Sequence, residues 1–482
     1  MRLLAIAERA RRRLIFLPAL VTVCAFGQKI LIAPYLQPGN ASGLNKEQKV
    51  LIWQTDSVPG NFLVQYKLIQ SNETTKSTKA QLASTQLVFN KKSFYLHRAV
   101  LSGLKFDETY SYTVSLGEKV ISESKFSTRT KKPLTQFAVF GDCGAGTPEQ
   151  ASIAYQVALK KPQFVLIPGD IAYSSGRELE FRLRFFPVYQ STELSISKGA
   201  PLIKSVPFYM ILGNHDVMSY NLSKYADGLA YYYFSDVPLN APVPTSIIEL
   251  KGTEEQIKAY KKNTSPRFPR TANYSFDQGN VHITCLDAND YANPFEPAIL
   301  EWLRADITSS KAEWKIVAYH QPAFNTATDH YDDQRMRLLS PLLEELGVNL
   351  VLTGHEHNYQ RSVPLKFNPK KSEDGMKYIV TKEGRVDGTF TLDNAFDGKT
   401  NTKPNGIIYI VSGAGGAVLY DTAFSNQPEK WKHNLPDNWA SFTTRFISHT
   451  HSFTWIETNG KKLLLQQIDK KGNVLDEITI TK

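Results

Sequence analysis

Five short apolar segments, each followed at once by polar side chains, constrain the fold of this 482-residue chain more than any other feature. Continuous apolar segments of this length are typical of strands buried on both faces, as in parallel sheets. A helix-like stretch joins the first two, with Thr147 as its cap, Pro148 at its first position and Gln150 three residues after the cap. The order strand, helix, strand predicts a parallel pair and an α/β fold. The five segments are residues 136–140, 163–167, 207–212, 315–319 and 348–353.

The same pattern extends toward the C-terminus. It predicts a strand over residues 281–286 and helices over residues 297–309 and 334–346, the second of which stops at Gly347. Residues 221–270 are rich in Tyr and then polar, and we interpret them as a loop or insertion near the site. Closing strands are expected over residues 406–412 and within residues 452–481.

The first quarter of the chain has a different pattern. From residue 30 to residue 132, stretches rich in β-branched and aromatic residues alternate with Gly, Asn, Asp and Lys. This spacing predicts an antiparallel sandwich of about 100 residues. The stretch shows no cluster of acids, bases or metal ligands, and we interpret it as a structural or docking module. Because the pattern changes at Pro133, we expect two domains, over residues 28–132 and 133–482.

Residues 1–27 predict a secretory signal. Five Arg precede the apolar stretch of residues 14–26, and residues 25–27 provide a cleavage site. We therefore expect a secreted or periplasmic protein, and removal of this segment lowers the net charge from +10 to +6. A lipid anchor on Cys24 is the alternative, and the bulky Val23 before it argues against that anchor.

Composition excludes several other classes of protein. With 42% hydrophobic and 21% charged residues, the chain is neither disordered nor collagen-like. No apolar stretch reaches about 18 residues, so we expect no transmembrane anchor. No cluster of Lys and Arg with interleaved aromatic residues marks a nucleic-acid site. Three Cys exclude a disulfide scaffold and leave open whether Cys143 and Cys285 pair.

The polar residues that follow the apolar segments are rich in metal-binding groups. In open α/β sheets, sites form at the carboxyl ends of strands, so these side chains can converge on one cleft. Three His, two Asp, an Asn and a Tyr are too many for one catalytic metal with an open position, and suit two metals that share a bridging carboxylate. His449 and His451 have similar spacing but lie in a strand-like stretch, and we interpret them as structural. The predicted ligands are Asp142, Asp170, Tyr173, Asn214, His320, His355 and His357.

Each apolar segment ends in a short block of Gly and polar residues, and the five blocks resemble those of a known superfamily, the metallophosphoesterases or calcineurin-like phosphoesterases. Tyr173, three residues after Asp170, makes the chain similar to the purple acid phosphatase branch. The resemblance implies an α/β protein in which a fibronectin-III-like β-sandwich precedes a four-layer α/β/β/α metallophosphoesterase domain. The blocks are Gly141-Asp-Cys-Gly144, Gly169-Asp-Ile-Ala-Tyr173, Gly213-Asn-His-Asp216, Ala318-Tyr-His320 and Gly354-His-Glu-His357, and softer likeness extends over residues 34–37, 53–55, 101–104, 412–416 and 469–480.

The resemblance also implies the metals, Fe(III) plus a divalent ion, which can be Zn, Mn or Fe(II), with Asp170 as the bridge. A phenol has a pKa of about 10, so Tyr173 becomes a ligand readily only beside a strongly Lewis-acidic cation such as Fe(III). Neutral imidazoles and an amide make the divalent site weaker and more exchangeable. By this resemblance Fe(III) takes Asp142, Tyr173 and His357, and the divalent ion takes Asn214, His320 and His355.

The activity that the resemblance implies is hydrolysis of phosphomonoesters, with small-molecule phosphate esters as substrates. The cations would lower the pKa of bound water, so that a metal-bound hydroxide attacks phosphorus. His215 would contact the phosphate, and His330, ten residues after His320, would protonate the leaving group. We therefore predict His215, His330 and Asp170 as catalytic residues. Asp329 stands where plant-type members carry His, a departure that bears on the leaving group and the pH optimum.

Two other functions stay open. A phosphodiesterase or nucleotide hydrolase of the same superfamily would use a similar centre, although Tyr173 and His330 favour the phosphomonoesterase. A surface binding protein with a vestigial metal site is the alternative from another class, and the complete set of donors argues against it. The sequence leaves the natural substrate and the oligomeric state undetermined.

Overall fold

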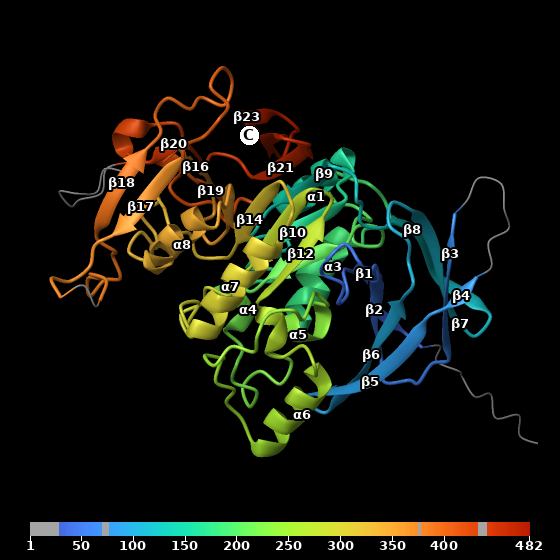
Figure 1. Ribbon diagram of the computed structural model, residues 1–482. Coiled ribbons are helices and arrows are strands. Elements are labelled where there is room, and N and C mark those ends of the chain that lie inside the picture. The colour runs from blue at the N-terminus through green and yellow to red at the C-terminus, as the bar shows by residue number, and fades with distance from the viewer. Residues whose placement is uncertain (1–27, 70–76, 375–376, 432–440) are drawn as a thin grey trace, which may run out of the picture.

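The computed structural model describes residues 28–69, 77–374, 377–431 and 441–482, and it shows a β-sandwich beside a larger α/β part (Figure 1). The predicted signal segment, including Cys24, lies outside the described residues. Within them, no helix has both the length and the apolar character that crossing a membrane requires.

Eight strands of the described residues between 30 and 127 form two four-stranded antiparallel sheets. One has the order β1-β2-β6-β5 and the other the order β4-β3-β7-β8. Side chains from both sheets, among them Trp53 and Tyr112, meet in a shared apolar core. This architecture confirms the predicted sandwich. Its strands are β1 (Ile30–Gln37), β2 (Lys49–Thr55), β3 (Phe62–Leu68), β4 (Thr78–Lys79), β5 (Gln81–Phe89), β6 (Lys92–Leu101), β7 (Thr109–Leu116) and β8 (Lys119–Ser127).

A six-stranded sheet follows, with the order β11-β10-β9-β21-β22-β23. Strands β9, β10 and β11 are parallel, and helix α1 (Pro148–Lys160) connects the first two. The hydroxyl of Thr147 caps α1 by accepting a hydrogen bond from the backbone nitrogen of Gln150 at 3.1 Å, as the sequence predicts. The C-terminal strands complete the sheet in antiparallel fashion. The strands are β9 (Leu134–Val139), β10 (Phe164–Pro168), β11 (Phe208–Ile211), β21 (Ser452–Asn459), β22 (Lys462–Asp469) and β23 (Val474–Thr481).

A seven-stranded sheet has the order β12-β13-β14-β15-β19-β16-β20. Four of its strands, β13, β14, β15 and β19, are parallel, and antiparallel strands flank them. The hairpin β17-β18 stands apart as a two-stranded sheet. The strands are β12 (Tyr274–Gln278), β13 (Val281–Cys285), β14 (Trp314–Ala318), β15 (Leu350–Thr353), β16 (Tyr359–Ser362), β17 (Leu365–Pro369), β18 (Gly388–Leu392), β19 (Ile408–Ser412) and β20 (Thr443–Ile447).

The two sheets pack face to face, and helices cover their outer faces, which confirms the four-layer α/β/β/α order (Figure 1). Apolar residues such as Phe164 and Ile283 fill the space between the sheets. Helices α1 and α3 cover the six-stranded sheet, and α7 and α8 cover the other. Because both faces are covered, the central strands have continuous apolar sequences. The helices are α1 (Pro148–Lys160), α2 (Glu178–Glu180), the π-helix η1 (Phe181–Phe185), α3 (Phe186–Tyr189), α4 (Asn214–Val217), α5 (Tyr231–Phe234), α6 (Glu254–Thr264), α7 (Pro297–Ser309) and α8 (Ser340–Glu345), with 3₁₀ turns η2 (Arg270–Ala272), η3 (Arg335–Leu339), η4 (Thr422–Phe424) and η5 (Pro428–Lys430).

The helix predicted over residues 334–346 is not continuous. The structure has the 3₁₀ turn η3 there, followed by the short helix α8. Pro341 accounts for the change, because it lacks the N–H that a continuous α-helix needs but is favourable in the first turn of a new helix. Gly347 follows with a φ of 69°, in the left-handed region where the predicted stop is expected.

Residues 221–270 also differ from the predicted loop. The aromatic helix α5 is fully buried, and the hydroxyl of Tyr231 donates to the backbone carbonyl of Met210 at 3.1 Å. Helix α6 packs against it through Tyr260, whose ring lies edge-on to that of Tyr233. The Tyr-rich half is therefore part of the core, where partners inside the protein satisfy a buried hydroxyl such as that of Tyr231.

Cys143 and Cys285 are both buried and free, which answers the question whether they pair. Cys143 belongs to the core outside the six-stranded sheet, whereas Cys285 belongs to the core between the two sheets. Their separation into different cores explains why they form no disulfide.

Candidate metal centre

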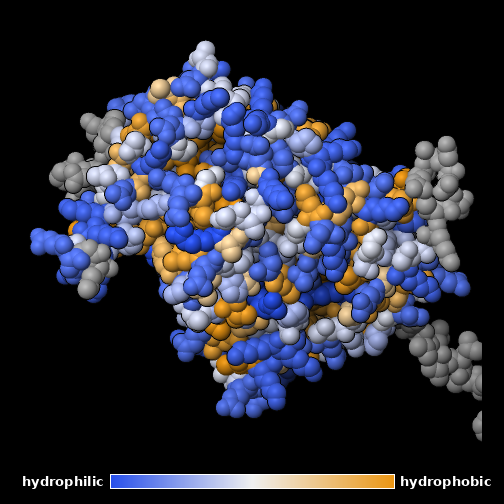
Figure 2. Space-filling view, in the orientation of Figure 1, coloured by the Kyte–Doolittle hydropathy of each residue, from blue (hydrophilic) through white to orange (hydrophobic). Residues whose placement is uncertain are grey.

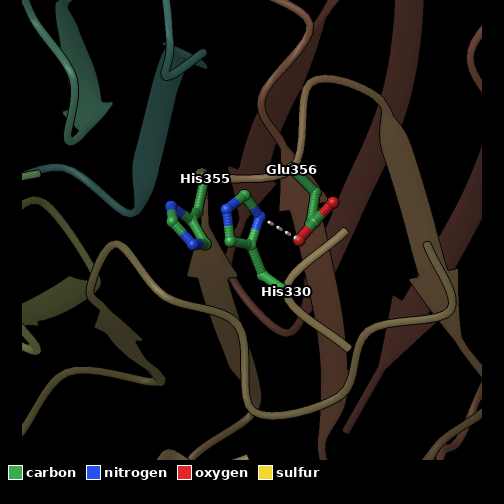
Figure 3. Close-up of side chains that lie close together, drawn as sticks. All are labelled: His330, His355 and Glu356. Atoms are coloured by element: carbon green, nitrogen blue, oxygen red, sulfur yellow. Dashed lines mark hydrogen bonds and ion pairs between the residues drawn. The ribbon is translucent and has the colours of Figure 1, made fainter. Parts of the chain in front are cut away.

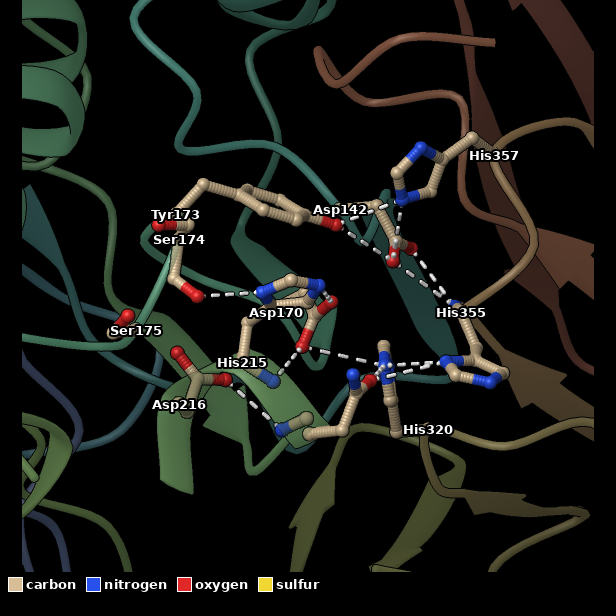
Figure 4. Close-up of polar contacts among 12 residues, drawn as sticks. Asp142, Asp170, Tyr173, Ser174, Ser175, His215, Asp216, His320, His355 and His357 are labelled. Carbon is tan, nitrogen blue, oxygen red and sulfur yellow. Dashed lines mark hydrogen bonds and ion pairs between the residues drawn. The ribbon is translucent and has the colours of Figure 1, made fainter. Parts of the chain in front are cut away.

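The structure brings all seven predicted ligands to one end of the two stacked sheets (Figure 4 labels six of them). Parallel strands end at the same edge of a sheet, and here the carboxyl ends of both sheets meet. The predicted ligands belong to the segments that follow these ends. Asp142 follows β9, Asp170 and Tyr173 follow β10, Asn214 begins α4 after β11, His320 follows β14, and His355 and His357 follow β15.

Asp142, Tyr173 and His357 form one group of donors (Figure 4). The Tyr173 hydroxyl lies 3.2 Å from Asp142 Oδ1 and 2.9 Å from His357 Nε2. His357 Nε2 lies 3.6 Å from Asp142 Oδ1. A carboxylate, a phenol and an imidazole at these separations can hold one ion between them.

Asn214, His320 and His355 form a second group. Asn214 Oδ1 lies 3.0 Å from His320 Nε2 and 3.1 Å from His355 Nδ1. The two imidazole nitrogens are 3.3 Å apart. Three lone-pair donors that point at one another in this way suit a shared cation better than mutual hydrogen bonding.

Asp170 lies between the two groups (Figure 4). Its carboxylate is within 4.8 Å of the donor atoms of Asp142 and His357, and Oδ1 is 3.4 Å from His320 Nε2. The backbone nitrogen of His215 donates to the same Oδ1 at 2.9 Å and fixes its direction. This position can supply a carboxylate to two ions at once.

Backbone carbonyls orient two of the imidazoles. His320 Nδ1 donates to the carbonyl of Pro168 at 2.8 Å, and His357 Nδ1 donates to that of Val418 at 2.6 Å. In the neutral form of each ring, Nε2 then carries no proton and can bind a metal, as second-shell contacts arrange in known metal sites.

The backbone of the centre is strained. Asp142, Asp170 and His355 have φ angles of 56°, 51° and 71°, in the left-handed region that residues other than Gly rarely adopt. Strain of this kind costs on the order of 1–3 kcal/mol per residue and is concentrated at functional sites.

Burial and charge set the protonation of the acidic donors. Burial raises the pKa of Asp142 well above its usual range, and Asp170 adds to the shift although His320 opposes it. Burial also raises the pKa of Tyr173, with further increases from Asp142 and Asp170. Burial would raise the pKa of Asp170 too, but the neighbouring imidazoles, first of all His320, hold it well below its usual range. Buried acids in this arrangement need positive charge nearby.

The imidazoles show the complementary behaviour. Burial lowers the pKa of His357 to about 4 and that of His355 well below 6.5, so both stay neutral, as metal ligands must. Burial also opposes the charged form of His320, but Asp170 raises its pKa to about 10. Protonated His320 compensates the negative charge of Asp170, a role that a bound cation can take over. The donor set therefore fits a centre of two metals.

The two predicted catalytic His lie at the edge of this centre. His215 Nδ1 donates to the carbonyl of Ser174 at 2.6 Å, and His215 Nε2 is 3.8 Å from Asp170 Oδ2 (Figure 4). The ring of His330 lies 4.0 Å, centroid to centroid, from that of His355. Its side chain is 43% exposed, so solvent can reach it.

Glu356 is a functional candidate that the sequence analysis did not single out. Its Oε1 accepts a hydrogen bond from His330 Nδ1 at 3.1 Å (Figure 3) and another from Asn325 Nδ2 at 2.9 Å. Its other oxygen is buried and has no hydrogen-bond partner among the described residues. Burial raises the pKa of Glu356 to about 7, against the effect of His330. His330, His355 and Glu356 also form a second cluster of potential ligands.

Tyr420 and Asp216 are two further residues whose contribution the sequence analysis missed. The Tyr420 ring stacks on His357 at 4.1 Å, and its hydroxyl lies 3.1 Å from His357 Nε2. Asp216 is buried and accepts hydrogen bonds from the backbone nitrogens of Ile171 and Gly213, which ties the second block to the third. The sequence gives no signal for Tyr420, since it follows no apolar segment, whereas Asp216 stands inside a recognisable block.

His449 and His451 are not among these donors. They belong to the connection between β20 and β21 rather than to a strand. His449 Nδ1 contacts the hydroxyl of Ser425 at 2.6 Å, and His451 Nε2 donates to the carbonyl of Ala417 at 2.8 Å. These contacts are structural in character, in line with the interpretation of the pair.

Two family models match the chain. One, described as calcineurin-like phosphoesterase, covers residues 135–359, which include all seven predicted ligands. The other, described as purple acid phosphatase, N-terminal domain, covers residues 40–130 of the sandwich.

Individual proteins agree with these models. The purple acid phosphatase of Glycine max is 23% identical over 423 residues, with 81% of this chain and 83% of the relative covered. Purple acid phosphatase 1 of Ipomoea batatas is 23% identical over 375 residues, with 71% and 72% covered. The structure of purple acid phosphatase PPD1 from yellow lupin (Lupinus luteus) seeds has a TM-score of 0.61 at 16% identity, covering 93% of this chain and 74% of that one, and shows the shared fold.

Proposed function

The chain belongs to the purple acid phosphatase branch of the calcineurin-like phosphoesterases, and from this premise we propose that it hydrolyses phosphomonoesters at the centre around Asp170. It is a hydrolase of the acid phosphatase class. The observation that supports the proposal is the convergence of seven oxygen and nitrogen donors into two groups, with one carboxylate between them.

The family implies a binuclear metal centre, and we assign Fe(III) to the group that contains Tyr173. The phenol supports this assignment, because a strongly Lewis-acidic ion is needed to displace a proton whose pKa is already raised by burial. When bound, the two ions neutralise phosphoryl oxygens and lower the pKa of water. The proposed ligands are Asp142, Tyr173 and His357 for Fe(III), Asn214, His320 and His355 for Zn, Mn or Fe(II), and Asp170 for both.

We assign binding of the phosphate to His215. Its Nδ1 is held by the carbonyl of Ser174, and its ring packs against that of Tyr173 at 4.5 Å. With the ring fixed in this way, Nε2 points toward the Asp170 side of the centre. In the protonated form, Nε2–H can donate to a phosphoryl oxygen without reorientation.

We assign protonation of the leaving alcohol to His330. The hydrogen bond to Glu356 raises the pKa of His330, although partial burial opposes this, and the protonated form is therefore available in acidic solution. Because Nδ1 is engaged by Glu356, Nε2 is the atom that can deliver the proton. The partly exposed ring can then recover a proton from water.

We also propose that the protein is exported by a signal over residues 1–27, which the basic start and the apolar stretch support. Sequencing the N-terminus of the protein recovered outside the cell tests this directly. A mature chain that begins near Gln28 is the expected result, and an intact Met1 in exported protein contradicts it.

The decisive experiment for the function compares turnover of an aryl phosphomonoester with turnover of the matching diester, between about pH 4 and 8. The protein is loaded with iron and zinc, and the Asp170→Asn variant provides the background. A large monoester preference that Asp170→Asn abolishes is expected. A diester preference would assign the chain to phosphodiester hydrolysis instead. Stoichiometric metal without turnover of either ester would indicate a vestigial site.

A further inference from the structure

The surface beside Asn214 is hollowed by a pocket of about 410 Å³. Its walls come from the segment that follows the third block, from residues 248–251 and from residues 289–291. Since Asn214 is both a predicted ligand and part of the pocket wall, the cavity adjoins the candidate metal centre. Its volume lies in the range of small-molecule sites.

Most of the exposed surface of the pocket walls is apolar. Val217 and Ile248 are buried in its walls, and the rings of Tyr220 and Tyr291 are partly buried against the core beside them. Met218 is 51% exposed, so its side chain is open to a ligand. Figure 2 shows apolar residues exposed on the lower lobe of the molecule, which carries α5 and α6. A thioether and two aromatic rings are favourable partners for another ring.

Two polar groups in the walls, the Asn289 amide and the Tyr291 hydroxyl, already have partners within the protein. Asn289 donates to Asp287 Oδ1 at 2.9 Å and accepts from Gln321 Nε2 at 3.1 Å. The Tyr291 hydroxyl donates to Asp287 Oδ2 at 2.5 Å. Because these two groups need no partner from a ligand, this part of the wall favours apolar contact over hydrogen bonds.

Charges at the pocket disfavour further anionic groups on a ligand. Glu249 and Asp290 contribute two negative charges, and Lys251 contributes one positive charge. The ammonium of Lys251 lies over the ring of Tyr220, 5.4 Å from its centroid. A neutral group is therefore accepted more readily than one that carries a second phosphate or a carboxylate.

We propose that this pocket holds the alcohol part of the substrate and selects phosphomonoesters whose alcohol carries a neutral aromatic ring. The inference rests on the proposed function, since it needs the phosphoryl group to be bound next to Asn214. From there a short linker places the ring between Met218 and the two tyrosines. The substrate class is thus an aralkyl or aryl phosphate rather than a small polar or a multiply charged ester.

The test compares phenethyl phosphate with ethyl phosphate, two esters whose alcohols have similar acidity and differ by the ring. We expect kcat/KM to be about tenfold or more higher for the phenethyl ester, from burial of the ring. A carboxylate on the ring should remove the preference. Inhibition by phenethylphosphonate and ethylphosphonate, which are not hydrolysed, gives an independent measure of binding and should show the same order.

Met218→Ala and Met218→Glu assign the preference to this pocket. Met218→Ala should reduce it and leave ethyl phosphate hydrolysis unchanged, since Met218 lies outside the donor groups. Met218→Glu should reduce it more strongly and is judged by the ratio of the two esters, because the added charge acts on both phosphates alike. Ile196→Ala is the matched control, because Ile196 is equally exposed, at 51%, and does not line the pocket.

The outcomes separate the two proposals. If neither ester is hydrolysed, the proposed function fails. If both are hydrolysed with equal kcat/KM, the phosphatase stands and the pocket assignment is wrong. A ring preference that survives Met218→Glu also overturns the assignment, because another surface must then bind the ring.

Discussion

Glycine precedes several donors of the centre, and at Gly213 the reason is the closeness of Asp170. A Cβ on Gly213 would lie 2.2 Å from the backbone nitrogen and from Oδ1 of Asp170. The φ of Gly213 is −103°, which any residue can adopt, so contact alone forbids a side chain. At Gly354 a Cβ would likewise lie 2.6 Å from Asp142 Oδ2. The glycines at these two positions thus make room for predicted ligands of other blocks.

We predict that Gly213→Ala displaces Asp170 and lowers metal affinity and activity on the order of 10- to 100-fold. Elemental analysis of metal per folded chain measures the first effect. Gly43→Ala is the control, because the nearest atom to its added Cβ is 3.5 Å away. Unchanged metal content in Gly213→Ala would show that Asp170 is not a ligand or that the loop yields freely.

Two phenols contact the same nitrogen, which gives a matched pair for assigning the iron ligand. The hydroxyls of Tyr173 and Tyr420 lie 2.9 Å and 3.1 Å from His357 Nε2. Of these two, Tyr173 also contacts Asp142 through a hydrogen bond, at 3.2 Å. We therefore predict that the iron-loaded protein has a purple or pink absorption band that Tyr173→Phe removes and Tyr420→Phe retains. The reverse pattern in visible spectra would make Tyr420 the ligand.

At the scale of secondary structure elements, His282 on β13 connects two neighbours. Its Nδ1 lies 2.8 Å from Asp277 Oδ1 on β12, and its Nε2 lies 3.0 Å from Asp306 Oδ2 on α7. Thr284 and Ser275 also donate to Asp306, at 2.9 and 2.6 Å. The network fastens the edge hairpin of the seven-stranded sheet to the helix that covers it.

This network predicts a pH-dependent stability. Burial lowers the pKa of His282, but the hydrogen bonds to Asp277 and Asp306 outweigh this effect and raise it to about 9, above the ordinary 6.5. The folded chain therefore holds this proton more tightly than the unfolded chain. The contribution, on the order of 3 kcal/mol, is complete below about pH 6.5 and is lost as the pH rises through about 9.

Urea unfolding between about pH 6 and 10 measures this contribution, with His282→Asn as the reference. The difference in unfolding free energy between the two proteins should shrink as the pH rises. A difference that stays constant over this range would show that His282 is neutral in the folded state.

At the scale of the whole molecule, the sandwich and the α/β part share a core. Tyr35 on β1 is fully buried, its hydroxyl donates to the carbonyl of Phe234 at 2.7 Å, and its ring lies 4.7 Å from that of Phe186. Arg98 on β6 pairs with Asp236 at 2.7 Å. The apolar cluster that contains Tyr35 continues through α3 and α5 to the six-stranded sheet. The sandwich therefore acts as part of the scaffold.

We predict that the chain unfolds in one cooperative transition and that Tyr35→Ala destabilises all of it, by about 3–5 kcal/mol. Tyr35→Phe keeps the ring and loses the hydrogen bond, so it should cost about 1–3 kcal/mol. Calorimetry tests both statements. Two resolved transitions, with only the smaller one shifted by Tyr35→Ala, would mean that the sandwich and the α/β part are independent.

Several features could be predicted from the sequence because they are local. Buried parallel strands must be continuously apolar, so β9, β10, β14 and β15 are visible as segments, and the residues after them are identified by position alone. The capped helix α1 is equally local, since Thr147 and Gln150 are three residues apart. The positions of the donors can thus be predicted from the strand ends, and the glycines before them are part of the same sequence motif.

Contacts between distant segments were decided only by the tertiary structure. Tyr420 is 63 residues from His357, and the Glu356 to His330 hydrogen bond joins positions 26 apart, so no local pattern reveals either. Some of residues 221–270 belong to the core and others to the pocket wall. Their packing against the sheets and the sandwich decides this division, which the composition of the segment cannot predict. The sequence by itself determined which side chains end the strands and hence the chemistry of the centre. The packing of the two sheets determined which of those side chains meet, what surrounds them and what a substrate would touch.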